Sequence, residues 1–305
     1  MHRTLSAAGA FWLAAFTYFI WGFTFLASRI AQDYGTPFVL LFWRFALAFL
    51  LLNLLRLTGR FPVRFRSRKL WPVLLAGLFE PVLYFPCEQY GLRLTSTSFS
   101  GVMVALIPLC SLVYGTIFLH EKATWRQGVI VLAVYATGIG AGSFLGFLIL
   151  LGTVFAGAGY IVACRACSGS FTAFERTYIT CGMGAAAFGV LSVLEHRHDL
   201  SAVVLPMTHA PFALAIVFLS VVASVLSYLA LNRALEVLPV ARTAALINFS
   251  TVVSVLAGVL LLHEPFGWVS AAASASILVG IWGVQRFAAP ALPDADKRTE
   301  PLPSS

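Results

Sequence analysis

Long apolar segments alternate with short polar gaps along almost the whole of this chain. Each apolar segment is about 20 residues long, the length that an α-helix needs to cross the hydrocarbon core of a bilayer. The segments do not show the alternation over about ten residues that is typical of a transmembrane barrel. The pattern predicts ten transmembrane helices, at about residues 11–31, 38–56, 70–93, 99–119, 127–143, 147–165, 174–194, 211–232, 241–262 and 268–287.

The two halves of the chain carry similar sequences. Residues 91–125 align with residues 234–268 after a shift of 143 positions, which brings His120 into register with His263. Seven of the 35 aligned positions are identical. Two apolar helices can match by chance, but the shared His-Glu-x-x-x-Trp sequences lie in expected loops, where apolar bias cannot produce them. We therefore expect a duplicated chain.

Five helices per half is an odd number, so the second half enters the membrane from the opposite side. The expected fold is all-α, with ten transmembrane helices arranged as two inverted five-helix repeats, a plan that recurs in secondary transporters. The expected units are residues 11–143, residues 147–287 and a disordered cytoplasmic tail at residues 288–305.

Composition and charge support this class and give an orientation. Hydrophobic residues make up 60% of the 305 positions and charged residues only 10%, too little polar surface for a water-soluble globule. The net charge of +8 includes a basic gap after the second expected helix, formed by Arg56, Arg60, Arg64, Arg66, Arg68 and Lys69. Cytoplasmic loops carry the excess of Lys and Arg, so this gap and both termini are predicted to be cytoplasmic.

The same features define the expected partners and compartment. The chain lacks the soluble basic face that nucleic-acid binding needs, so we expect a lipid bilayer and a small-molecule solute as partners, and no nucleic acid. The excess of Arg over Lys is typical of a GC-rich bacterial genome, which favours the bacterial inner membrane as the location. The sequence leaves open whether the chain is a monomer or a homodimer.

Three charged residues lie several positions inside expected transmembrane helices, away from the helix ends. Arg44 is on the second helix, and Glu80 and Glu88 are on the third. Such residues are costly in a bilayer and mark functional sites by default. Arg44 and Glu88 lie at about the same depth, so we predict that they are close enough to pair, as an outer gate or a structural link. Snorkelling of Arg44 to the outer interface is the alternative.

Glu80 is the candidate proton carrier, because it lies near the midplane, where burial disfavours an ionised carboxylate. Tyr84 is four residues from both glutamates, which predicts one helical stripe. Pro81 and Pro86 interrupt this helix, which is tolerated where the backbone borders protein or a watery cavity. The alternative is that Glu80 only fastens helices together.

Neutral polar residues follow the eighth helix at i+4 spacing. They are Ser220, Ser224, Tyr228 and Asn232. Such a stripe can bind a polar solute or hold helices together, and Asn248 on the ninth helix adds a donor and an acceptor. The His-Glu pairs at His120 and His263 lack the second histidine of a zinc-protease helix and are interpreted as loop anchors. We expect no metal or cofactor.

Several short motifs occur in a specific order. They are Trp21-Gly22, Phe42-Trp43-Arg44, Tyr90-Gly91-Leu92 running into Thr95-Ser96-Thr97-Ser98, Pro108 and Leu119-His120-Glu121, then Ala234-Leu235 and Leu262-His263-Glu264. Over about residues 11–287 the chain resembles the EamA-type members of the drug/metabolite transporter superfamily. It departs from them at Gly91, where the family more often has Ala, and at Thr251, where the second copy often has Pro.

The resemblance implies two five-helix repeats around a central cavity that exports or exchanges small metabolites without ATP. In that family helices 1, 3, 4, 6, 8 and 9 line the cavity. This would give roles to Trp21, Glu80, Tyr84, Tyr160, Tyr228 and Asn248.

We therefore predict a secondary transporter that exports small metabolites such as amino acids by alternating access. Glu80 is the leading proton site, Arg44 and Glu88 form a gate or structural pair, and the stripe on the eighth helix is part of the solute wall. An ion-independent facilitative carrier or exchanger is the first alternative. An integral-membrane enzyme or scaffold is the second, but an enzyme would need a nucleophile with a base, or a carboxylate cluster, at a membrane face.

Overall fold

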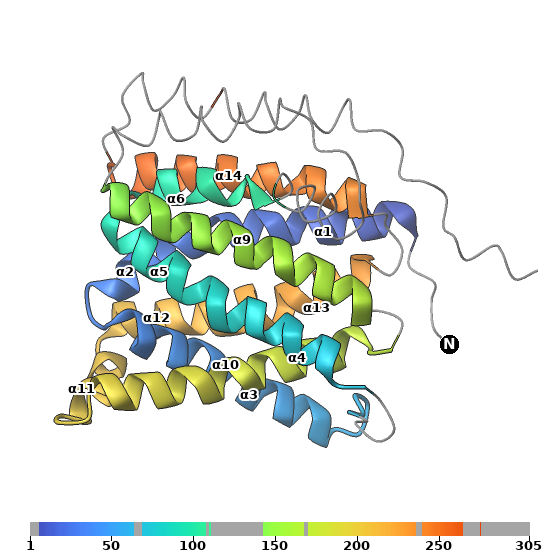
Figure 1. The fold of residues 1–305 in the computed structure, drawn as a ribbon, viewed down its shortest axis with the longest axis horizontal. Coiled ribbons are helices and arrows are strands. Elements are labelled where there is room, and N and C mark those ends of the chain that lie inside the picture. The colour runs from blue at the N-terminus through green and yellow to red at the C-terminus, as the bar shows by residue number, and fades with distance from the viewer. Residues whose placement is uncertain are drawn as a thin grey trace, which may run out of the picture.

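The described segments of the chain fold into a bundle of roughly parallel and antiparallel helices (Figure 1). The computed structural model describes residues 6–63, 69–107, 110, 143–167, 170–235, 240–264 and 275. No β-strand is found in these ranges. The all-helical class predicted from the sequence is confirmed for them.

The helices of the first half are α1 (Ala7–Gly22), α2 (Thr24–Gln32), α3 (Pro37–Leu57), α4 (Trp71–Gly77), η1 (Leu78–Leu83), α5 (Tyr84–Leu94) and α6 (Thr97–Val104). Those of the second half are α9 (Phe144–Cys167), α10 (Ala173–Glu195), α11 (Ser201–Val204), η2 (Leu205–Thr208), α12 (Ala210–Val217), η3 (Phe218–Leu226), α13 (Ser227–Leu235) and α14 (Val240–Leu261). Of the expected spans, the fifth and tenth and most of the fourth lie outside the described residues, whereas the others coincide with helices.

Within the part of the chain that the structure describes, four helical runs are long and apolar enough to cross a membrane. They are Ala7–Gln32, Pro37–Leu57, Ala173–Glu195 and Ala210–Ala234, and shorter apolar helices cover Phe144–Tyr160 and Phe249–Leu261. Local sequence explains where several helices begin. Pro37 opens α3, where its missing N–H costs nothing. Thr172 and Glu175 form a capping box that satisfies free N–H groups at the start of α10.

The third and eighth expected helices each contain a π-helical segment, η1 and η3. In η1 the backbone of Glu80 is not helical, with φ −140° and ψ 111°, and the next residue is Pro81. Shifting Leu78–Leu83 by 143 positions lays it on Val221–Leu226, which lies inside η3. The two halves therefore depart from α-helical geometry at equivalent places.

Side chains donate hydrogen bonds to backbone carbonyl oxygens of η3. The wider π-helical turn disturbs the usual pattern of backbone hydrogen bonds there. Trp21 Nε1 donates to the carbonyl oxygen of Ala223 at 3.0 Å. Ser227 Oγ donates to the carbonyl oxygen of Val222 at 2.8 Å. The first of these bonds ties α1 to η3.

Several described helices of the first half run opposite to helices of the second half. In Figure 1, α1 begins at the right of the bundle and α9 begins at the left. The start of α3 lies at the end of α10, where Thr36 Oγ1 donates to Glu195 Oε2 at 2.7 Å. The start of α6 lies at the end of α14, where Glu264 contacts Thr97.

The main packing partners belong to different halves. Helix α10 packs along α3, α5 along α9, and α14 against both α1 and α6. One large apolar core therefore draws on both halves, with Phe45 and Met103 from the first, and Phe188, Phe212 and Ile216 from the second. Neither half encloses this core by itself.

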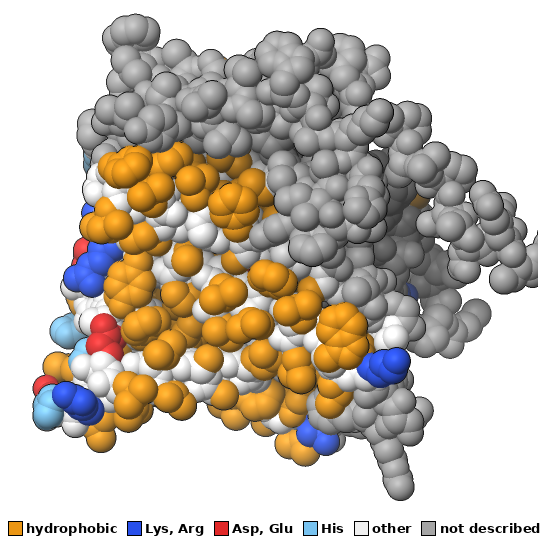
Figure 2. All heavy atoms as spheres, viewed as in Figure 1, with side chains coloured by type: hydrophobic (Ala, Val, Ile, Leu, Met, Phe, Trp, Pro, Cys, Tyr) orange, Lys and Arg blue, Asp and Glu red, His pale blue; other side chains and the backbone are white. Residues whose placement is uncertain are grey.

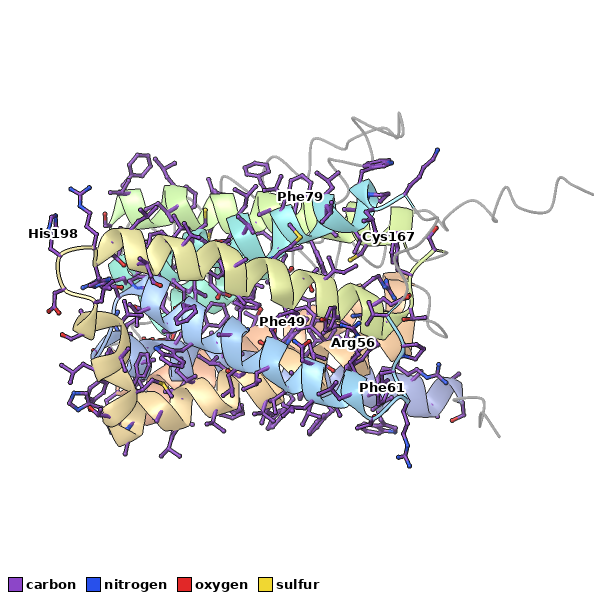
Figure 3. The ribbon with its side chains drawn as sticks, turned by 90° about the horizontal axis from the view of Figure 1, so that it is seen from below. Phe49, Arg56, Phe61, Phe79, Cys167 and His198 are labelled. Atoms are coloured by element: carbon purple, nitrogen blue, oxygen red, sulfur yellow. The ribbon has the colours of Figure 1, made fainter. Side chains whose placement is uncertain are left out.

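The outside of the bundle is apolar along its length and polar at its ends. Hydrophobic side chains cover most of the described face in Figure 2, whereas charged side chains and histidines gather at its two ends. Trp71, Leu214 and Leu260 are each more than 60% exposed. His198 lies at one end of the bundle, and Phe61 and Cys167 lie toward the other (Figure 3). An apolar belt between two polar ends is the surface that a bilayer requires.

Candidate functional site

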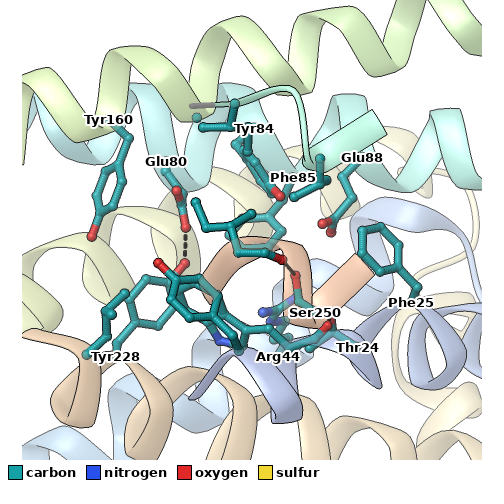
Figure 4. A pocket seen from close by; sticks show the side chains of 17 residues that line it. Thr24, Phe25, Arg44, Glu80, Tyr84, Phe85, Glu88, Tyr160, Tyr228 and Ser250 are labelled. Atoms are coloured by element: carbon teal, nitrogen blue, oxygen red, sulfur yellow. Dashed lines mark hydrogen bonds between the residues drawn. The ribbon is translucent and has the colours of Figure 1, made fainter. Parts of the chain in front are cut away.

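A cavity of about 110 Å³ lies inside the bundle, and both halves of the chain contribute to its wall (Figure 4). A cavity of roughly 150 Å³ can hold benzene, so this one suits a solute of a few non-hydrogen atoms. Three of its lining residues have an acidic or basic side chain: Arg44, Glu80 and Glu88. Aromatic side chains form much of the rest.

One aromatic face comes from α1 and α2, where Tyr18, Trp21 and Phe25 line the cavity. The ring centroids of Tyr18 and Trp21 are 5.5 Å apart, and those of Trp21 and Tyr228 are 5.2 Å apart. The sequence analysis named Trp21 but missed Tyr18 and Phe25. Their i, i+3, i+7 spacing, which puts three aromatic residues on one helical face, is the signal that could have found them.

Glu80 reaches the cavity from the break in η1. Its carboxylate accepts a hydrogen bond from the hydroxyl of Tyr228 on α13, as Figure 4 shows. Glu80 belongs to the first half of the chain and Tyr228 to the second, so this bond joins the halves across the cavity. Tyr84 and Tyr160, which the sequence analysis also singled out, line the same cavity.

Arg44 lines the cavity from α3 and is only 2% exposed. Its Nε donates to Ser224 Oγ at 3.1 Å, and its guanidinium carbon lies 4.3 Å from the ring centroid of Phe85. Its Nη1 is buried and has no hydrogen-bond partner. This burial disagrees with snorkelling, in which the charged head would reach water.

Arg44 and Glu88, which were predicted to be close enough to pair, make no direct ion pair, although their opposite charges attract across the cavity. Both side chains line the cavity, but within the described part of the chain no carboxylate makes an ion pair with Arg44. Glu88 is 4% exposed and accepts from Gln89 Nε2 at 3.0 Å. The same nitrogen of Gln89 lies 3.2 Å from Ser28 Oγ. Depth along a helix was predictable from the sequence, but the directions of these side chains were not.

The neutral stripe of the eighth expected helix does not face the cavity as a unit. Tyr228 lines it, but Ser224 is fully buried against Arg44, and Asn232 Nδ2 donates to Thr177 Oγ1 at 3.2 Å. A π-helical turn holds more residues than an α-helical turn, so η3 rotates Ser224 away from the face that carries Tyr228. Asn232 lies one α-helical turn beyond Tyr228 on α13, where it meets α10. The side chain of Asn248 lies outside the described residues.

Glu264, next to His263, ties the end of α14 to the start of α6. Its Oε1 accepts from the N–H of Thr97 at 2.6 Å, and its Oε2 accepts from the N–H and Oγ of Ser98 at 3.0 and 2.8 Å. A carboxylate is favoured at a helix N-terminus because the free N–H groups there carry partial positive charge. We call these contacts the Glu264 cap. They agree with the interpretation of this loop as an anchor, while Glu121 lies outside the described residues.

Comparisons with known proteins agree with one another. The model of the EamA-like transporter family matches twice in succession, at residues 8–140 and 144–286. The uncharacterized transporter YcxC of Bacillus subtilis (strain 168) is 30% identical over 285 residues, which cover 89% of this chain and 91% of that protein. An uncharacterized transporter of Archaeoglobus fulgidus is 25% identical over 291 residues, covering 89% and 97%. A crystal structure with 17% identity has a TM-score of 0.64 and covers 92% of this chain and 97% of that one, which shows a shared fold.

Proposed function

Because this chain belongs to the EamA-like transporter family, we propose that it is a secondary transporter that exports small metabolites such as amino acids by alternating access. The observation that carries the proposal is a small cavity of mixed aromatic and ionisable character, walled by both halves of a bundle whose exterior is apolar. Both curated relatives are named as transporters, which favours transport over an enzymatic or scaffolding role.

We propose ten transmembrane helices in two inverted five-helix repeats, at about residues 11–143 and 147–287. Four observations support this arrangement. The family model matches twice in succession, and several described helices of the first half run opposite to helices of the second half. The π-helical segments occupy equivalent positions. The packing also keeps its pattern when the halves are exchanged, because α1 packs on α13 and α14 while α9 packs on α5 and α6.

Contacts that cross between the halves support alternating access. Glu80 with Tyr228, Arg44 with Ser224, and Trp21 with Ala223 each join the first half to the second beside the cavity. Opening the cavity to either side of the membrane requires some of these contacts to break and others to persist. Two repeats with opposite orientation in the membrane can form an inward-open and an outward-open conformation that are nearly equivalent.

Glu80 is proposed as the proton-coupling group. It lies at a helix break beside the cavity, and its carboxylate bonds to the opposite half. Protonation would remove the charge that this bond stabilises, and so would link proton binding to the contact between the halves. Glu88, with its bond to Gln89, and Arg44 are proposed to act near the outer gate.

The proposed location is a bacterial inner membrane with both termini in the cytoplasm. Arg56, in the last turn of α3, lies toward one end of the bundle with Arg60 four residues further along the chain, whereas His198 lies at the opposite end. The basic end is cytoplasmic by the usual bias of Lys and Arg. An oligomer is not required, since the cavity is walled by one chain.

The test is transport by the purified chain in proteoliposomes. We expect counterflow, in which an excess of unlabelled solute inside the vesicle drives uptake of labelled solute, for members of a panel of amino acids and related small metabolites. Glu80→Gln should remove the dependence of uptake on an imposed pH gradient while counterflow persists. Unchanged pH dependence in Glu80→Gln would remove the proton role and leave the ion-independent carrier. Absence of counterflow for every solute would overturn the proposal.

A further inference from the structure

We propose that the solute carries a carboxylate and that Arg44 binds it inside the cavity. This inference rests on the proposed transport function and adds the chemical class of the solute. It starts from the buried Nη1 of Arg44, which has no hydrogen-bond acceptor although the residue lines the cavity.

The contacts of Arg44 leave most of its hydrogen-bonding capacity unused. A guanidinium has five N–H donors in a planar fork, and here Nε donates to Ser224 while the buried Nη1 has no acceptor. Two ring faces, those of Phe85 at 4.3 Å and Phe45 at 5.5 Å, give partial compensation. Aromatic faces cannot accept the parallel pair of hydrogen bonds that a carboxylate accepts from this fork.

The two carboxyl groups that share the cavity do not fill this role. Glu80 accepts from the hydroxyl of Tyr228, and Glu88 accepts from Gln89 Nε2 at 3.0 Å. Each therefore has its own donor, and neither forms an ion pair with Arg44 within the ranges that the structure describes. Leaving buried N–H donors unused is unfavourable, so a ligand whose carboxylate accepts hydrogen bonds from Arg44 binds with advantage.

Size and wall chemistry define the rest of the solute. A volume of about 110 Å³ is smaller than the roughly 150 Å³ that holds the six carbons of benzene, so it suits a solute of about four to six non-hydrogen atoms. The rings of Tyr18, Trp21 and Phe25 offer apolar contact for a short carbon chain beside the carboxylate. Butyrate and L-alanine, each with six non-hydrogen atoms, are suitable probes, since only L-alanine adds an ammonium group that the two glutamates could receive.

The experiment compares each acid with its uncharged amide of nearly the same shape. Binding of butyrate, butyramide, L-alanine and L-alaninamide to the purified full chain is measured by calorimetry in lipid nanodiscs. We expect each carboxylate to bind more tightly than its amide, and Arg44→Gln to weaken carboxylate binding by about thirtyfold or more while leaving butyramide unchanged. The affinity of Arg44→Lys for carboxylates should lie between those of the unmodified chain and Arg44→Gln, because lysine keeps the charge and loses the planar pair of donors.

Arg29→Gln is the matched control. Arg29 is also partly buried, but its Nη1 donates to the carbonyl oxygen of Leu92 and the residue does not line the cavity. We expect this variant to keep the full preference for carboxylates. If Arg44→Gln fails to fold, the comparison of acid with amide on the unmodified chain still tests whether the site prefers a carboxylate.

Three results would overturn the inference: equal affinity for acid and amide, no carboxylate binding to the folded unmodified chain, or binding of butylamine in place of butyrate. The last would assign recognition to Glu80 and Glu88. Counterflow separates the two proposals. Exchange of amines or neutral solutes alone would keep the transporter and reject the carboxylate, whereas carboxylate binding without any counterflow would keep the site and reject the transporter.

Discussion

Replacing Glu264 should weaken the attachment of α6 to α14. The carboxylate accepts from two backbone N–H groups, those of Thr97 at 2.6 Å and Ser98 at 3.0 Å, and from the Ser98 hydroxyl at 2.8 Å. A hydrogen bond to a charged group contributes about 1.5–3 kcal/mol. The hydroxyl can find another acceptor, and Glu264 is partly exposed, so we count only the two N–H groups at the lower value. Glu264→Ala should therefore lower the free energy of unfolding by about 3 kcal/mol.

The measurement is reversible unfolding in mixed detergent micelles, together with amide hydrogen exchange at Thr97 and Ser98. Glu264→Gln keeps an acceptor oxygen, so its free energy of unfolding should fall by only about 1 kcal/mol. Glu195→Ala is the matched control, because Glu195 lies at the same end of the bundle and accepts one hydrogen bond, from the Thr36 hydroxyl, besides lying 3.7 Å from His196 Nδ1. We expect it to cost less than about 1 kcal/mol. Equal losses for the two alanine variants, or unchanged exchange at Thr97 and Ser98, would refute the reasoning about the Glu264 cap.

Three further predictions follow from other contacts. Gly22→Ala places a methyl group against Val253 Cβ and the backbone carbonyl oxygen of Ser250, so it should destabilise the bundle by about 2 kcal/mol. Val253→Ala in the same chain should not restore stability, because alanine keeps the Cβ and the carbonyl oxygen stays; full rescue in unfolding experiments would contradict this packing. Trp21→Phe keeps a ring but loses the bond to the Ala223 carbonyl oxygen, so unfolding should show a loss of about 1–2 kcal/mol, whereas an unchanged value would mean that this bond contributes nothing. In a chain without its five cysteines, Lys69→Cys and His263→Cys should react with an impermeant maleimide from opposite sides of the membrane; labelling from one side would exclude the inverted topology.

Much of the fold was predictable, because helix length and apolar runs follow directly from the demands of a bilayer. The described helices fall at the expected spans, and the break in the third helix was indicated by Pro81. The π-helical segment at η3 was not, since Phe218–Leu226 contains no proline or glycine. That segment depends on packing with α1 and α3, which no local pattern records.

The sequence predicted which residues lie at the candidate site better than it predicted which partners they contact. Depth in the membrane correctly singled out Arg44, Glu80 and Glu88 as side chains that share one cavity. The partners of these groups depend on side-chain directions. Arg44 contacts Ser224 instead of Glu88, and Tyr228 contacts Glu80, because η3 turns the polar face of the eighth helix.

The sharing of one core between the halves has a consequence for how the chain is made. Helices α3, α5 and α1 leave the ribosome well before α10, α9 and α14, against which they pack. During that interval their future contact faces can meet only lipid or the insertion machinery. Two separately synthesised fragments divided near Ser143 should therefore assemble only when both are present in the same membrane, and a first fragment alone should be degraded.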